Sequence, residues 1–184
     1  MESSTLSPLF GFEAMPLMEG FSLEEKVFSL NTYLHNKILK ENLDIFIVGV
    51  PSGIRGIDMY NLNHFGEMAL AVSFAVKADI SVCCMYYGIP DKELFEYMYN
   101  FYLWKFGVIN DYYHINCVTA LNGTINDEMK TRYLTLEQTE ISEALHKCYR
   151  KSKAPLFSIH DDASLKRTLD DMLSELTDNA ETVR

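Results

Sequence analysis

The chain has 184 residues, of which 48% are hydrophobic and 12% aromatic, enough for a single domain with a substantial core. Its formal net charge of −10 disfavours nucleic acids and anionic membranes, because both are bound mainly through Lys and Arg. The apolar runs are too short to cross a bilayer, and residues 1–8 lack the basic and apolar regions of a signal peptide. We therefore expect a cytoplasmic protein that binds neither nucleic acid nor membrane.

Residues 1–21 mix glycine and proline with many apolar side chains, which predicts an irregular strap packed along the domain edge. Ser22 and Glu25 then have the spacing of a capping box, and apolar residues follow at helical spacing. The pattern predicts a first helix that begins at Ser22 and ends near Asn42.

Residues 45–50 form a nearly continuous run of β-branched and aromatic side chains that ends at Pro51. Such a run is typical of a strand that is covered on both faces. We expect residues 45–50 to be a central parallel strand, followed by a long loop and a helix over residues 65–78.

The later part of the chain continues the alternation of strands and helices. In chain order, the patterns predict a strand at 80–87, a helix opened by Asp91, strands at 113–121 and 132–136, a helix at 137–150, an edge strand at 155–159 and a last helix from Ser164. The fold class is therefore α/β, three-layered, with a mostly parallel central sheet of about four to five strands and helices on both faces. We expect one domain over residues 1–177, with its core in 22–177, and a flexible tail at 178–184.

The loop after the first predicted strand is the first candidate for a binding site, because ligands of open α/β sheets bind beyond the carboxyl ends of the strands. It gathers hydroxyl, cationic, acidic, amide and imidazole side chains. The candidate ligand-binding residues are Ser52, Gly53, Arg55, Asp58, Asn63 and His64. The alternative interpretation is that the glycines only shape a turn while Arg55 and Asp58 pair with each other.

Known nucleotide and catalytic motifs are not found in the sequence. A P-loop would need a Lys that residues 49–56 lack, and the three close glycines of a dinucleotide site are missing. His114 and His160 could bind a metal, but two residues do not complete a ligand set. The four cysteines have no metal-site spacing, so we expect free, mostly buried thiols, no disulfide, no metal, no cofactor and no catalytic residue.

Aromatic side chains crowd the helix opened by Asp91 and fall on more than one of its sides. Because Tyr and Trp are common anchors of protein interfaces, this excess predicts a partner or self-association surface. The interface candidates are Phe10, Phe12, Tyr99, Tyr102 and Trp104. A helix sandwiched inside a small domain would show the same pattern.

Three segments together resemble a known family: residues 11–16, residues 41–54 and residues 63–66. In this order they are similar to the C-terminal half of the clostridial peptide maturation system proteins, which accompany radical-SAM maturases and ribosomally made peptides. The resemblance covers residues 8–136 and implies a genomic context but no catalytic residue. Family members are about twice as long, with an added N-terminal region that this chain lacks.

The residues and the resemblance lead to two hypotheses. The first is a non-catalytic accessory protein that binds a peptide precursor, a carrier protein or a maturation enzyme, and that can also form a homo-oligomer. The alternative is a small-molecule-binding domain or an enzyme that uses the loop of residues 52–64. An accessory protein needs an exposed aromatic surface, whereas an enzyme needs a polar pocket with convergent titratable groups.

Overall fold

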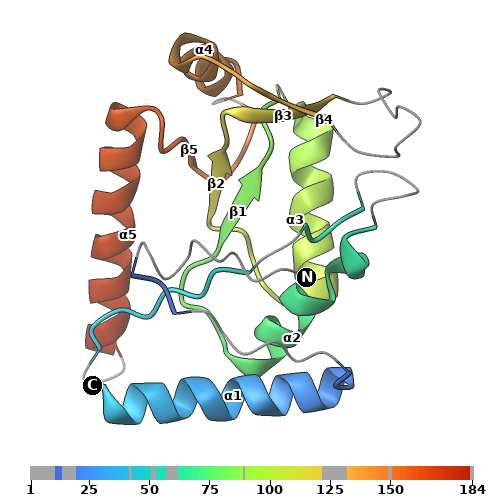
Figure 1. Cartoon of the computed structure of the whole chain (residues 1–184). Coiled ribbons are helices and arrows are strands. Elements are labelled where there is room, and N and C mark those ends of the chain that lie inside the picture. Colours follow the sequence, from blue (N-terminus) through green and yellow to red (C-terminus); the bar gives the residue numbers. More distant parts are fainter. Residues whose placement is uncertain are drawn as a thin grey trace. The chain divides into compact units, whose positions relative to one another are not determined.

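The computed structural model describes residues 11–13, 20–41, 43–50, 53–56, 62–88, 90–121, 132–148 and 151–182 (Figure 1). The chain divides into two compact units, one formed by Met1–Gly56 and Asn63–Val76 and the other by Ile57–Leu62 and Lys77–Arg184. We call them unit 1 and unit 2 and describe each by itself. The expectation of a single domain stays a prediction.

Unit 1 is built on helix α1 (Leu23–Lys40), the short 3-10 helix η2 (Asn63–Gly66) and helix α2 (Glu67–Ala75). The predicted capping box is confirmed: the Glu25 amide donates to Ser22 Oγ at 3.3 Å, and the Ser22 amide donates to Glu25 Oε2 at 2.8 Å. These bonds satisfy amides at the helix start that have no partner within the helix. The first helix therefore begins where the sequence predicts.

The core of unit 1 is small and lies between α1 and α2. Leu30, Ala71 and Ala75 are buried there, and Leu23, Val27 and Val72 pack against them. Two polar contacts join the same helices, from Lys26 Nζ to Glu67 Oε1 and from Asn31 Nδ2 to the Ala75 carbonyl, both at 2.7 Å. Alanines on α2 allow the two helices to approach closely.

The expectation of a central strand at residues 45–50 is wrong. The structure has no strand in residues 43–50, and the side chain of Ile47 is 78% exposed. Ile45, Phe46 and Val50 are also exposed. The run has strand-like composition, but burial on both faces requires neighbouring strands that composition does not supply.

Unit 2 holds a three-stranded parallel sheet in the order β1 (Val82–Met85), β2 (Tyr112–Ile115) and β5 (Leu156–Phe157). A separate antiparallel ribbon pairs β3 (Val118–Leu121) with β4 (Arg132–Thr135). The α/β class is confirmed, but the parallel sheet has fewer strands than expected. The expected strand at 113–121 divides in two, because the Asn116 amide bonds to Met85 of β1 whereas the Cys117 carbonyl accepts from Leu136, beyond β4.

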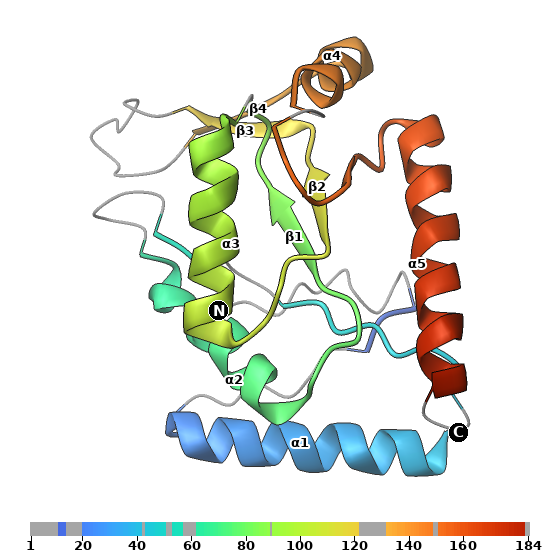
Figure 2. The ribbon, with the colours of Figure 1, turned by 180° about the vertical axis from the view of Figure 1, so that it is seen from behind.

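Two helices flank the parallel sheet of unit 2. Helix α3 (Lys92–Phe106) packs on one face, where the ring of Phe95 meets Tyr113 edge to face at 5.1 Å. Helix α5 (Asp162–Thr182) lies toward the other face, where Tyr112 Oη donates to Glu175 Oε2 at 3.2 Å. Figures 1 and 2 show the sheet between these two helices.

The remaining helix of unit 2 is α4 (Gln138–Cys148), close to its predicted range. Helix α5 continues to Thr182, although the sequence predicts a flexible tail from residue 178. Cys83 and Cys148 are buried, Cys117 is partly exposed and Cys84 is exposed, so these free thiols are less uniformly covered than expected. In the described part of the chain, every helix is too short or too polar to cross a membrane.

Candidate functional site

The predicted binding loop does not lie at the end of a sheet strand, because residues 45–50 form none. Gly53 and Arg55 lie in an irregular segment, and Ser52 and Asp58 fall outside the described residues. Asn63 opens η2, and the side chain of His64 is exposed. The expected placement of this loop at a carboxyl edge of the sheet is therefore wrong.

The backbone of Ile54 in this loop lies close to that of Gly66, two residues beyond the end of the loop. Gly66 has a φ of +71°, and a Cβ atom there would lie 2.7 Å from the Ile54 carbonyl oxygen. The preceding residues, His64 and Phe65, also have positive φ values of 48° and 53°. Gly66 is thus required by a close backbone approach, which shapes the loop without adding a polar group to it.

Helix α3 carries the largest group of aromatic side chains, and its ends explain its position. Asp91 caps its start through a 2.7 Å bond from the Leu94 amide, and Gly107 ends it in the left-handed conformation with a φ of 66°. Phe95 and Phe106 are buried. The helix therefore has one side covered by the rest of unit 2.

Tyr102 belongs to the covered side, although the sequence made it an interface candidate. It bonds to Cys83 of β1, and its side chain is partly buried. Burial raises the pKa of Cys83 to about 11, and burial together with this thiol raises the pKa of Tyr102 well above its usual range. Both groups stay protonated at neutral pH and serve packing.

The opposite side of α3 bears a shallow hollow of about 310 Å³. We call this surface the α3 aromatic face; its residues are Tyr97, Asn100, Phe101, Trp104 and Lys105. The Tyr97 and Phe101 rings stack with centroids 5.9 Å apart, and Lys105 Nζ lies 5.1 Å from the centre of the Phe101 ring. Trp104 is 82% exposed. An apolar floor with a cation at one end can hold an apolar side chain of a partner.

The interface candidates therefore have different positions. Trp104 lies in the α3 aromatic face, Tyr99 is exposed on the same helix and Phe12 is exposed in the N-terminal region. Phe10 lies outside the described residues. Tyr97, Asn100, Phe101 and Lys105 were not among the candidates, although their spacing of three or four residues from one another and from Trp104 could have identified them.

The parallel sheet brings a thiol and an imidazole side by side, since Cys84 of β1 is in register with His114 of β2. Burial, and then the nearby His160, lower the pKa of His114, while burial raises the pKa of Cys84. Both groups are therefore neutral at pH 7, which does not favour an activated thiolate. Among the described residues, no group of three His, Cys, Asp or Glu side chains could hold a metal ion.

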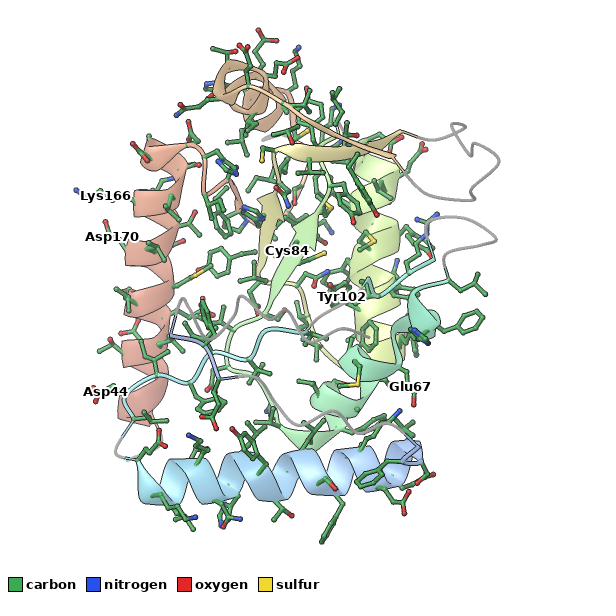
Figure 3. All side chains as sticks on the ribbon, viewed as in Figure 1. Asp44, Glu67, Cys84, Tyr102, Lys166 and Asp170 are labelled. Carbon is green, nitrogen blue, oxygen red and sulfur yellow. The ribbon has the colours of Figure 1, made fainter. Side chains whose placement is uncertain are left out.

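A second hollow, of about 510 Å³, runs along the outer side of α5. Its lining includes Lys166, Arg167, Asp170 and Asp171, all from this helix. Figure 3 shows Lys166 and Asp170 pointing away from the sheet. Mixed charges on one exposed helix side are typical of a solvated surface.

Comparisons with known proteins give no match from which a function could be inferred, so the functional proposal below starts from the geometry of the structure. No family model matches the chain, and neither the curated proteins nor the solved structures contain a match.

Proposed function

We propose that this chain is a non-catalytic accessory protein that binds another polypeptide through the α3 aromatic face. The exposure of Trp104 carries the proposal. Its side chain is 82% exposed, and Trp is among the residues most enriched at the centres of protein interfaces. An indole in this position gives a partner a large apolar area to cover.

The surroundings of Trp104 support an anchoring role. Stacking with Phe101 holds the Tyr97 ring, and Lys105 lies over Phe101. Rings that are already ordered lose little side-chain entropy on binding. The face is thus suited to hold an apolar anchor of the partner, with the Lys105 ammonium beside it.

The family resemblance indicates three classes of partner: a ribosomally made precursor peptide, a carrier protein and a maturation enzyme. The chain has a net charge of −10, so basic segments in any of them would be attracted before contact. We rank the precursor peptide first, because a hollow of about 310 Å³ suits one or two side chains.

The test uses Trp104 as its own probe, since it is the single tryptophan of the sequence. Fluorescence emission of the purified protein is recorded while a precursor peptide, carrier protein or maturation enzyme encoded beside the gene is added. Binding at the α3 aromatic face should shift the emission to shorter wavelength, because the indole leaves water. Calorimetry then gives the affinity.

A matched pair of variants locates the surface. Trp104→Ala should weaken binding by more than about 1 kcal/mol, roughly a fivefold rise in Kd. Phe28→Ala removes an aromatic ring that is 76% exposed on α1 and should leave Kd unchanged. Equal affinities for both variants, or unchanged emission with all three partner classes, would exclude the proposal.

A further inference from the structure

The two edges of the parallel sheet in unit 2 differ in how they are protected. Strand β5 has two residues, both buried, and follows Pro155, which lacks an amide hydrogen. Short length and proline are common ways to prevent a sheet edge from pairing with another strand. Strand β1 has four residues, none of them charged and none a proline. Within the described residues β1 ends the sheet, so this edge lacks the usual protection.

The backbone of β1 offers hydrogen-bonding groups on its outer side. The Ser81 carbonyl accepts from the Tyr112 amide at 3.2 Å, and the Met85 carbonyl accepts from the Asn116 amide at 2.9 Å. Because backbone groups alternate in direction along a strand, the N–H and C=O groups of Val82 and Cys84 point away from β2. The side chain of Val82 is 40% exposed and that of Cys84 is exposed as well.

We propose that β1 pairs edge to edge with β1 of a second copy of this chain, antiparallel and around a two-fold axis. With Val82 of one copy opposite Cys84 of the other, every outward N–H and C=O group of both residues finds a partner. The two sheets become one continuous sheet. This surface is separate from the α3 aromatic face, and the inference does not depend on the proposed function.

The chemistry of the strand favours a second copy as the occupant. A two-fold pair places each strand against itself, which charged residues would oppose, and Val82, Cys83, Cys84 and Met85 are all uncharged. The protected β5 edge keeps the assembly closed at two copies. Two chains of net charge −10 repel each other, so the dimer should tighten as salt rises.

Hydrogen exchange on the unmodified protein tests the pairing directly. The amides of Cys83 and Met85 point toward β2 and should exchange slowly at every protein concentration. The amides of Val82 and Cys84 should exchange fast in dilute protein and slow down as concentration rises. Fast exchange of Val82 and Cys84 at all concentrations overturns the proposal, and so does slow exchange at all concentrations, which would mean that the chain covers its own edge.

Two lysine variants with the same change in charge provide the second test. Val82→Lys places like charges at the shared edge and should raise the dimer dissociation constant, measured by sedimentation, at least about tenfold. Ile159→Lys adds the same charge at an exposed site just beyond β5. Its dissociation constant should equal that of the unmodified protein at the same salt concentration. A dimer that tolerates Val82→Lys but not Ile159→Lys overturns the proposal.

Trp104→Ala separates this inference from the proposed function. It should leave the dimer unchanged, because Trp104 lies in the α3 aromatic face and not on β1. If Trp104→Ala dissociates the dimer while Val82→Lys does not, the copies meet through α3 and the β1 pairing is wrong. Loss of partner binding in Trp104→Ala with an intact dimer supports both statements independently.

Discussion

Strand β2 and residues 45–50 are similar in the kind of side chain that they carry but lie in opposite environments. Both are short runs rich in β-branched or aromatic side chains. All four residues of β2 are buried, whereas Ile47 is 78% exposed. Strand β2 lies between β1 and β5 and between two helices, so its burial comes from its neighbours. An apolar run therefore indicates that its side chains favour burial, but it does not show whether the fold buries them.

The largest expected effect comes from truncating one isoleucine in each run and comparing the losses of stability. Ile115 is fully buried in β2, so Ile115→Ala should lower the free energy of unfolding by about 2–5 kcal/mol through lost apolar contact and a cavity. Ile47→Ala should change it by less than about 0.5 kcal/mol. Urea unfolding followed by circular dichroism measures both. Equal losses would mean that residues 45–50 are as buried as β2.

A second prediction concerns a local feature, the cap at the start of α3. The Asp91 carboxylate accepts from the Leu94 amide at 2.7 Å, so Asp91→Ala should destabilise the protein by about 1 kcal/mol through loss of the α3 cap. Asp91→Asn keeps an acceptor and should retain most of the stability. If the two variants unfold at the same urea concentration, the cap does not stabilise α3 in the way its geometry indicates.

The smallest expected effect is on the pH dependence of the protein's stability, and it arises from His114 of β2. Burial, followed by the nearby His160, lowers the pKa of His114 from 6.5, so the unfolded chain takes up this proton more readily than the folded one. The contribution of His114 to the free energy of unfolding is therefore highest above pH 6.5, and it decreases as the pH falls from 6.5 toward the lowered pKa of His114. His114→Leu should therefore flatten the fall in urea midpoint over this range.

His35→Leu is the matched control for His114→Leu, because the side chain of His35 is exposed on α1. It should leave the pH dependence of the urea midpoint as it is in the unmodified protein. A His114→Leu profile that follows the control and the unmodified protein alike would show that the burial of His114 does not govern acid sensitivity.

The candidate site could be predicted from the sequence only in part. The aromatic excess on α3 was visible, and Trp104, one of the interface candidates, is 82% exposed in the structure. The sequence could not decide that Tyr102 faces Cys83, because that depends on where β1 lies relative to α3. The polar loop failed as a strand-end site for the same reason, since its position depended on a strand at residues 45–50 that the fold does not form.

The sequence by itself determined the features that depend on near neighbours along the chain. Ser22 and Glu25 start α1, and Asp91 and Gly107 bound α3, because caps are made by contacts within a few residues. Only the tertiary structure decided which apolar run is buried, which strands pair and which side of α3 remains exposed. These outcomes depend on residues distant in sequence, such as Tyr112 with Val82 and Phe157 with His114, and no local pattern encodes such partners.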